Sequence, residues 1–358
     1  MYKLIGLLFL VLFISGCSGI ENVPYLTEKR GIAVAEIQAL AETTPVPSSD
    51  DAADDPAIWV NANNPELSRV LGTDKQFGLI VYDLEGRQLQ ALAEGRLNNV
   101  DVRQNLLVAG ARYDLAVASS RTHNSLDVFL INPDTGVTEF VDRQLLDLTE
   151  PYGTCLYKGE NDIAYAFVND TDGRYQQWRL DSLHPLRMTE VRDFRVLTQP
   201  EGCAADDFTG DLFVGEENAA LWRFSALPDA GDSRSLMDRT GAGALVADLE
   251  GMDIYRVNEE LAYLVTSSQG DFTYAVYEAQ GNYRYLGSFR IVDDILAGVD
   301  GSEETDGLAL SNQYLGENYP KGMLVVQDGF NLNPRQAQNF KYVSWQAIAE
   351  ALNLQSIE

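Results

Sequence analysis

The strongest constraint on the fold is a loose repeat of about 45 to 50 residues, which recurs six times along the chain. Every unit opens with a short polar motif and an apolar run; the six openings are DDPAIWV (54), NNVDV (98), YGTCLY (152), EGCAADD (201), EGMDIY (250) and TDGLAL (305). A second apolar run, an aromatic-rich third run and a weaker fourth run follow, separated by Gly, Asp, Asn and Pro. Four strands per unit at this period are typical of a β-propeller, so the sequence predicts an all-β, six-bladed propeller.

A propeller must also close its ring, because an open sheet edge can pair with other chains. The run GIAVAEIQAL (31–40) precedes the first unit, and we expect it to form the outer strand of the last blade. The segment SWQAIAEALNL (344–354) has the one convincing helical pattern, which predicts a short C-terminal helix. A large β-sandwich is the competing all-β architecture, and it fits the regular period less well.

The N-terminal residues predict export. Lys3 precedes an apolar run, Leu4–Ile14, which is shorter than the roughly 18 residues of a membrane-spanning helix. A basic start, a short apolar core and small residues before a cleavage point are typical of a secretory signal. The sequence ISGC, which ends at Cys17, resembles a bacterial lipobox, whose cysteine becomes the lipidated first residue of the mature chain. A signal cleaved nearby, with Cys17 incidental, is the alternative.

Lipidation at Cys17 defines three parts of the chain. They are a lipoprotein signal peptide (1–16), a lipid-anchored tether with an entry strand (17–44) and the propeller domain (45–358). Ser18, not aspartate, follows the cysteine, and resemblance to lipoprotein sorting then favours the outer membrane, with the protein facing the periplasm or the cell surface. The lipid anchor is the one membrane contact that we expect.

Export also bears on the remaining two cysteines, Cys155 and Cys203, because disulfides persist in an oxidising compartment. Each follows a glycine-containing turn at a matching point of successive repeats, Tyr152-Gly153-Thr154 and Glu201-Gly202. The sequence therefore predicts a Cys155–Cys203 disulfide, with two buried free thiols as the alternative.

The charge of the chain excludes several classes of function. There are 54 acidic and 26 basic residues, a formal net charge of −28, so bulk electrostatics argues against a nucleic-acid partner.

The two histidines, His123 and His184, lack metal-like spacing, which gives little support to a histidine zinc site or a Ser-His-Asp triad. Nucleophile-elbow, P-loop and dinucleotide-binding motifs are absent from the sequence.

The unit openings are candidate ligands for a metal. The first strand of each propeller blade lines the central channel, so Asp54, Asp55, Glu201 and Glu250 should meet at one mouth. Carboxylates with amide and carbonyl neighbours are hard oxygen ligands that suit Ca²⁺. Further candidates are Asp51, Glu216, Glu217, Asp248, Gln269, Asp300, Asp306 and Asp328. Asp-Gly pairs also suit tight turns, so any one of them can be a turn residue alone.

Three cations stand out beside these carboxylates. Lys75 in GTDKQ and Arg121 in ASSRTHN follow second strands, and Arg174 lies in NDTDGRYQ. Metal ions together with a few cations form a site for a polyanion, and phosphate is the one that fits best. Bound cations polarise phosphoryl oxygens and lower the pKa of a bound water.

The chain resembles the β-propeller phytases, the bacterial calcium-dependent 3-phytases. The matching motifs run in order from about residue 45 to 350 and span essentially the whole mature domain. They are DAADDPAIWV (51–60), GLIVYDLEG (78–86), LNNVDVR (97–103), EGCAADD (201–207), DLEGMDIY (248–255), SSQGDFTYAVYE (267–278), DGSEETDG (300–307), VVQDG (325–329) and QNFKYVSW (338–345).

The resemblance implies a 3-phytase-type phosphoric monoester hydrolase with several Ca²⁺ ions. Such an enzyme hydrolyses phytate, myo-inositol hexakisphosphate, as a calcium complex by attack of metal-activated water on phosphorus. The residues that resemble ligands of the catalytic calcium cluster are Asp54, Glu201, Glu217, Asp248, Glu250 and Gln269. Asp51, Asp55 and the carbonyls of Pro56 and Val100 resemble one further calcium site, and Asp300, Asp328 and Asn331 resemble another. The residues that resemble phosphate binders are Lys75, Arg121 and Tyr152.

The chain departs from the family pattern at three positions. Thr171 stands where a lysine is usual, with Arg174 as a substitute; Gln76 replaces a second lysine, and Phe330 an acidic ligand. The changes at Thr171 and Gln76 leave open a non-catalytic surface propeller that binds a phosphorylated ligand or a partner protein. A calcium propeller hydrolase of another kind, such as a lactonase, is a third alternative, and it leaves Lys75 and Arg121 unexplained. We expect a monomer in each case.

Overall fold

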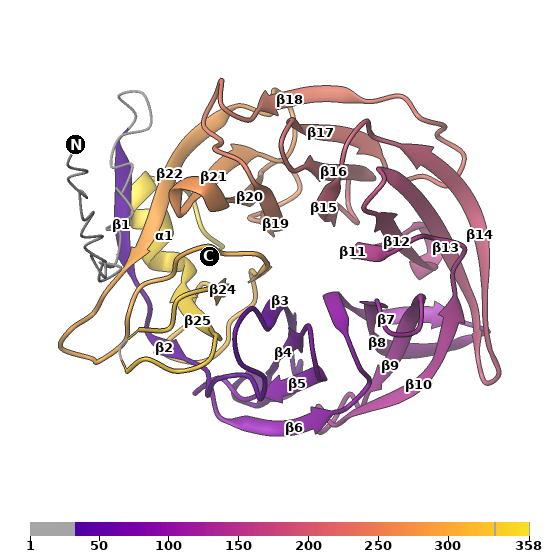
Figure 1. The fold of residues 1–358 in the computed structure, drawn as a ribbon, viewed down its shortest axis with the longest axis horizontal. Coiled ribbons are helices and arrows are strands. Elements are labelled where there is room, and N and C mark those ends of the chain that lie inside the picture. The colour runs from indigo at the N-terminus through magenta and orange to yellow at the C-terminus, as the bar shows by residue number, and fades with distance from the viewer. Residues whose placement is uncertain (1–32, 333, 358) are drawn as a thin grey trace, which may run out of the picture.

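Six β-sheets surround a central channel in the computed structural model, which describes residues 33–332 and 334–357 (Figure 1). The predicted signal peptide and the lipidation site at Cys17 lie outside the described residues. Each sheet holds one sequence repeat with its strands in chain order from the channel outward, and every pair within a repeat is antiparallel. The predicted six-bladed β-propeller is confirmed.

The strand bounds follow the six repeats. Blade one is β3 (Ala53–Trp59), β4 (Arg69–Asp74), β5 (Gly78–Tyr82) and β6 (Gln88–Leu92). Blade two is β7 (Leu97–Val108), β8 (Ala111–Ser120), β9 (Ser125–Ile131) and β10 (Thr138–Leu145). Blade three is β11 (Pro151–Lys158), β12 (Ala164–Asp170), β13 (Arg174–Leu183) and β14 (Leu186–Arg195). Blade four is β15 (Pro200–Ala205), β16 (Asp211–Glu216), β17 (Ala220–Ser225) and β18 (Ser235–Arg239).

The last two blades also take strands from the N-terminal segment. Blade five is β19 (Leu249–Arg256), β20 (Ala262–Ser268), β21 (Thr273–Glu278), β22 (Tyr285–Val292) and β1 (Val34–Gln38). Blade six is β23 (Leu308–Ser311), β24 (Met323–Asp328), β25 (Asn339–Ser344) and β2 (Ala41–Glu42). Three short 3₁₀ turns, η1 (Pro65–Leu67), η2 (Glu160–Asp162) and η3 (Gln269–Asp271), and the helix α1 (Trp345–Leu352) complete the described elements.

Ring closure differs in part from the prediction. The segment predicted at 31–40 does form a strand, β1, but it pairs in parallel with β22 on blade five and not with the last blade. The outer strand of the last blade is the two-residue β2, which pairs antiparallel with β25. The N-terminal segment therefore spans the junction of blades five and six and joins both ends of the chain.

The innermost strands approach one another closely enough to require glycine. A methyl group on Gly153 would lie 1.9 Å from the carbonyl oxygen of Glu201, and one on Gly202 would lie 2.2 Å from that of Glu250. A side chain at either position would force the two strands apart. This contact explains why a glycine follows the polar residue in several unit openings.

Aspartate side chains bind the inner strands to one another. Asp55 accepts from the Val100 amide at 3.0 Å, and Asp101 accepts from the Leu156 amide at 2.7 Å. Asp253 accepts from the Leu310 amide, also at 2.7 Å. Because inner strands have an unpaired edge at the channel, these carboxylates satisfy backbone donors that would otherwise lack a partner.

The apolar core of the described chain is divided into six clusters, one between each pair of neighbouring blades. Between blades three and four, Tyr175 stacks on Phe194 with their ring centroids 4.9 Å apart. Between blades five and six, Trp345 of α1 stacks on Tyr255 at 3.9 Å. The helix buries Trp345, Ile348 and Ala349, which have the i, i+3, i+4 spacing of one helical face.

Across the part of the chain that the structure covers, no helix has the length and apolar composition needed to span a membrane.

The predicted disulfide between Cys155 and Cys203 is confirmed, with a Cα–Cα distance of 5.8 Å. It joins β11 to β15, the innermost strands of blades three and four. Both cysteines are buried in the cluster between these blades.

Removal of the disulfide should lower the stability of the propeller without changing its fold. The two cysteines are 48 residues apart, and in the chain-entropy treatment a loop of that length corresponds to about 4 kcal/mol. We expect a Cys155→Ser/Cys203→Ser variant to unfold at a lower urea concentration, with its free energy of unfolding reduced by about that amount. Dithiothreitol should reproduce the loss in the wild-type protein and have no effect on the variant; equal stabilities would contradict this prediction.

Candidate functional site

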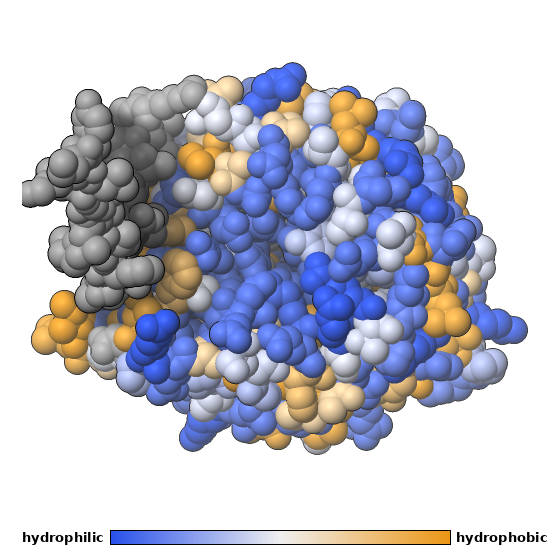
Figure 2. Space-filling view, viewed as in Figure 1, coloured by the Kyte–Doolittle hydropathy of each residue, from blue (hydrophilic) through white to orange (hydrophobic). Residues whose placement is uncertain are grey.

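The six unit-opening residues form a ring at one end of the channel. They are Asp54, Asn98, Tyr152, Glu201, Glu250 and Asp306, one from the start of each blade. Hydrogen bonds connect neighbours in this ring: the Gly251 amide donates to the Asp306 carbonyl at 2.6 Å, and the Gly307 amide donates to the Asp54 carbonyl at 3.0 Å. Polar residues gather around the hollowed centre of the face shown in Figure 2. Of the four residues predicted to meet at one mouth, Asp54, Glu201 and Glu250 lie in this ring, whereas Asp55 binds the Val100 amide further inside the channel.

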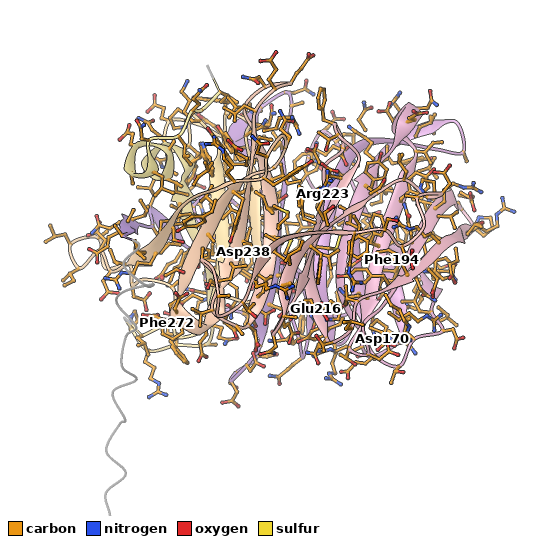
Figure 3. The ribbon with its side chains drawn as sticks, turned by 90° about the horizontal axis from the view of Figure 1, so that it is seen from above. Asp170, Phe194, Glu216, Arg223, Asp238 and Phe272 are labelled. Atoms are coloured by element: carbon orange, nitrogen blue, oxygen red, sulfur yellow. A yellow bond between two sulfur atoms is a disulfide. The ribbon has the colours of Figure 1, made fainter. Side chains whose placement is uncertain are left out.

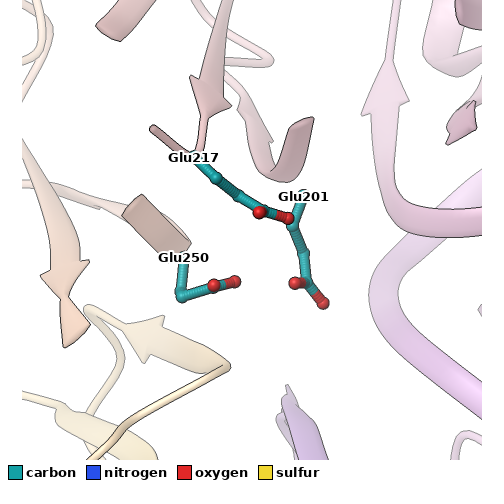
Figure 4. Close-up of side chains that lie close together, drawn as sticks. All are labelled: Glu201, Glu217 and Glu250. Atoms are coloured by element: carbon teal, nitrogen blue, oxygen red, sulfur yellow. The ribbon is translucent and has the colours of Figure 1, made fainter. Parts of the chain in front are cut away.

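Three glutamates stand at the centre of this mouth. Glu201 and Glu250 come from the inner strands β15 and β19, and Glu217 follows β16 (Figure 4). Each offers a carboxylate oxygen, and these oxygens lie within 4.8 Å of one another. All three residues are at least 95% buried. Burial, together with repulsion from Glu201, raises the pKa of Glu250 well above its ordinary value, and burial raises the pKa of Glu217 to about 7.

Several buried polar atoms at the mouth have no hydrogen-bond partner among the residues described. They are Asp54 Oδ2, Asn98 Oδ1 and Glu250 Oε2. An unsatisfied buried acceptor costs about 1–3 kcal/mol, more when it is charged. Three such oxygens beside converging carboxylates fit the coordination shell of a hard divalent cation, which would also reverse the raised carboxyl pKa values.

Lys75 neutralises part of this negative charge. Its ammonium lies 2.7 Å from Asp51, 2.9 Å from Asp306 and 3.4 Å from Asp54. Burial alone would lower the pKa of Lys75, but Asp54 and Asp306 raise it above its ordinary value, so the side chain stays protonated. Lys75, one of the three cationic side chains singled out in the sequence, therefore lies at the mouth.

Arg121 and Tyr152 form the side of the mouth at blades two and three. The Arg121 guanidinium lies over the Tyr152 ring, 4.6 Å from its centroid, and pairs with Glu150 at 3.3 Å. Tyr152 hydrogen-bonds to Glu201, and burial together with Glu201 raises the pKa of its hydroxyl. Tyr152 thus remains a protonated donor next to the glutamates.

Gln269 and Asp248 complete the predicted cluster on the side of blade five. Gln269 donates from its side chain to Asp306 at 2.7 Å and from its backbone to the Asp248 carbonyl at 3.0 Å. Asp248 lies close enough to Glu217 to raise the pKa of that carboxyl, and Gln199 donates to Glu217 at 2.8 Å. These contacts connect Asp306 to Glu217 around the mouth.

The residues predicted for the first additional calcium site are only partly together. Asp55 is 7% exposed and binds the Val100 amide, and Asp55, Pro56 and Val100 line a small cavity of about 30 Å³ inside the channel. Asp51 instead is exposed and pairs with Lys75 at the mouth. Asp51 and Asp55 therefore have different surroundings. The neighbours Asp54 and Asp55 also differ, since Asp54 lies at the mouth and Asp55 inside the channel.

The residues predicted for the second additional site, Asp300, Asp328 and Asn331, converge, but around a lysine that the sequence analysis did not include. The fully buried Lys341 ammonium lies 2.5 Å from Asp300 and 3.1 Å from Asp328, and it also pairs with Glu42. Burial raises the pKa of Asp328 to about 6 despite this pairing. Among the described residues, Asn331 Oδ1 has no hydrogen-bond partner, so an acceptor remains for a cation there.

Two of the predicted site residues, Arg174 and Glu216, bind neighbouring parts of their own blades and not the glutamate cluster. Arg174 pairs with Asp193 of the outer strand β14 at 2.8 Å and donates to the Asp147 carbonyl, so its contacts are with the outer part of blade three and not with the glutamates. Glu216 accepts from the Thr198 amide at 2.6 Å and from Trp222 at 2.7 Å, and thereby fixes the loop before β15. Figure 3 shows Glu216 and Asp170, which binds the Thr149 and Glu150 amides in the same way, toward the same face of the disc.

The other end of the channel carries ion pairs. Arg103 binds Asp101 at 2.8 Å and Asp207 at 2.9 Å, and Arg256 pairs with Asp206. These residues line a cavity of about 320 Å³. Burial, followed by repulsion from Asp101, raises the pKa of Asp253 in this region to about 7.

Two residues that contribute to these clusters were not predicted as site residues. Asn98 appears in the unit opening NNVDV, and its position alone could have indicated it. Lys341 lies in β25, the third strand of blade six, and the sequence contains no local signal that places it among acids.

Comparison of the sequence with known proteins identifies a family. The sequence profile described as phytase matches residues 7–356. The 3-phytase of Bacillus subtilis (strain 168) is 41% identical over 328 residues, which cover 88% of this chain and 85% of that protein. Among solved structures, a functionally unknown protein from Desulfotomaculum acetoxidans DSM 771 superposes with a TM-score of 0.45 at 15% identity, covering 65% of this chain and 70% of that one.

The pKa of Asp253 makes stability depend on pH. A carboxyl whose pKa is near 7 when folded and about 3.9 when unfolded binds more protons in the folded state between these values. Stability should therefore fall as pH rises from about 4 to about 7. In EDTA, we expect Asp253→Asn to reduce the loss of unfolding free energy between pH 5 and pH 8, measured by urea denaturation. The exposed Asp134→Asn is the control, and an unchanged loss in Asp253→Asn would contradict the assignment.

Proposed function

The chain belongs to the phytase family and is a phosphoric monoester hydrolase that acts on phytate, and we propose that it does so with calcium bound at the channel mouth. The observation that carries the calcium proposal is the convergence of Glu201, Glu217 and Glu250 next to buried oxygens that lack partners. Burial, followed by repulsion from neighbouring carboxylates, raises the pKa values of Glu250 and Glu217, and a bound cation would stabilise their charged forms.

The donor set favours calcium over softer metals. Candidate ligands are the carboxylates of Asp54, Glu201, Glu217, Glu250 and Asp306 with the amide oxygen of Gln269, all of them oxygen donors. Calcium accepts six to eight such ligands in irregular geometry, whereas zinc prefers histidine and cysteine. When bound, calcium supplies charge neutralisation at phosphoryl oxygens and a lower pKa for water.

Lys75 and Arg121 bind phosphate in this proposal. Hydrolysis of a phosphomonoester depends mainly on positioning and on neutralising the phosphoryl oxygens. The protonated Lys75 supplies a positive charge on the side of blades one and six, and Arg121 supplies another on the side of blades two and three. A phosphate between them is bound from two directions, which fixes its orientation.

Glu201 and Tyr152 act on the reacting groups. Glu201 is nearly fully buried and accepts hydrogen bonds from Asn98 and Tyr152, which hold its carboxylate in one orientation. A carboxylate so placed can orient the attacking water and accept its proton. The Tyr152 hydroxyl stays protonated and can donate to a phosphoryl oxygen. We assign no phosphate contact to Arg174, because its guanidinium is bound at the outer part of blade three.

The proposal also covers the form of the substrate, the attachment of the protein to a membrane and its oligomeric state. A calcium–phytate complex as the substrate suits a protein of net charge −28, because the free hexakisphosphate would be repelled. Lipidation at Cys17 and outer-membrane attachment are supported by the apolar leader and by the Cys155–Cys203 disulfide, which fits an oxidising compartment. We propose a monomer, since one chain supplies the whole mouth.

Chelation and substitution at the mouth should both abolish activity. We expect the purified protein to release phosphate from phytate, EDTA to stop this release, and added calcium to restore it. Glu201→Gln and Lys75→Met should each reduce kcat/KM by at least about 100-fold, in line with loss of a group that acts in the transition state. Wild-type protein that releases no phosphate at saturating calcium would disprove the catalytic part of the proposal.

The neighbouring aspartates should separate stability from turnover. Asp55→Ala leaves the Val100 amide unsatisfied and should cost about 1–3 kcal/mol, with a smaller rise in melting temperature on calcium addition. Asp54→Ala removes a mouth carboxylate that pairs with Lys75 and should mainly lower kcat. Melting curves and phytate kinetics on both variants, with and without calcium, test this; the reverse pattern would overturn the division.

A further inference from the structure

We propose that Asn98 is both a ligand of the calcium at the mouth and the residue that positions Glu201. Asn98 begins blade two in the ring of unit-opening residues and is 1% exposed. The inference rests on the proposal that calcium occupies the glutamate cluster.

The hydrogen bonds of Asn98 fix the orientation of its amide. Its nitrogen donates to Glu201 Oε1 at 2.8 Å and to Asn99 Oδ1 at 2.7 Å. Both N–H groups are thus used on acceptors. The flipped amide would place its oxygen against two other oxygens, which is repulsive, so the nitrogen must face Glu201.

With the amide held this way, Asn98 Oδ1 points away from Glu201 Oε1. It is buried and has no hydrogen-bond partner within the described part of the chain. The other two unpartnered oxygens of the mouth, Asp54 Oδ2 and Glu250 Oε2, belong to the same ring of unit-opening residues. Asn98 Oδ1 is thus an acceptor available to a cation beside the glutamates, and a neutral amide oxygen is a suitable calcium ligand.

An amide suits this position better than a carboxylate. Four of the six unit-opening residues are already acidic: Asp54, Glu201, Glu250 and Asp306. Glu201 is buried beside Asp54 and Glu250 in this ring, and a further carboxylate 2.8 Å from it would add repulsion. Asn98 instead donates an N–H to Glu201. Asn98 therefore contributes an oxygen ligand without adding charge.

Substitutions at Asn98 separate the two parts of the proposal. Asn98→Ala removes both the ligand oxygen and the donor, and calcium affinity should fall by about 10- to 100-fold. Asn98→Asp keeps an oxygen near the place of Oδ1 but loses the donor, so its calcium affinity should lie above that of Asn98→Ala. The measurement is calorimetric titration of chelator-treated protein with calcium alone.

The positioning part has its own measurement. At saturating calcium, both variants should show lower kcat for phytate with KM within about twofold of wild type, because Glu201 is no longer held while the phosphate binders are intact. Gln177→Ala is the matched control: Gln177 is fully buried, donates to the Ala226 carbonyl and has an unpartnered Oε1, but lies in β13 away from the mouth. It should lower the melting temperature and leave calcium affinity and kcat unchanged.

Three results would overturn the inference. They are wild-type calcium affinity in Asn98→Ala, weaker calcium binding in Asn98→Asp than in Asn98→Ala, or an equal loss of calcium affinity in Gln177→Ala. Failure of the proposed function would look different: the wild-type protein would bind calcium and release no phosphate. The ranking of calcium affinities would still test Asn98 in that case.

Discussion

The close approach of the six innermost strands is the constraint on which the rest of the molecule depends. Gly153 and Gly202 allow each strand to contact the carbonyl of the next within van der Waals distance. This contact brings the residue before each glycine to the same level of a narrow ring. Polar side chains from six distant parts of the chain therefore meet at one mouth, and no single blade could assemble them.

Such a ring gathers negative charge, and its electrostatics follow from that. Asp54, Glu201, Glu250 and Asp306 are largely buried together, so burial and mutual repulsion raise the pKa values of Glu250 and Asp306. In the proposed function, a bound cation stabilises the charged carboxylates against both effects, and a substrate with many phosphates would then meet less negative charge at the mouth. The proposed metal thereby reconciles an acidic chain with a polyanionic substrate.

The repeated features of the fold could be predicted from the sequence. The pairing that closes the ring and the surroundings of single side chains could not. The unit openings located all six inner strands, and matching positions in two repeats were enough to predict the Cys155–Cys203 disulfide. Pairing of β1 with blade five depends on contacts between residues about 250 apart, which leave no local pattern. Lys341 reaches Asp300 and Asp328 across strands of the closing blade, so its role was equally hidden. Arg174 differs from its prediction for another reason: it begins β13, and its side chain pairs with Asp193 of the neighbouring outer strand.

Lys75 and Lys341 neutralise part of the charge of the acidic clusters when no metal is bound. The sequence has six lysines, and two of them, Lys75 and Lys341, lie within the two groups of converging carboxylates. An ammonium bound to two or three carboxylates offsets much of their repulsion and satisfies some of their oxygens. Both groups still keep an unpartnered oxygen, Asp54 Oδ2 in one and Asn331 Oδ1 in the other, within the described residues. The lysines therefore neutralise each cluster only in part, and each cluster keeps acceptors that a further cation or donor could satisfy.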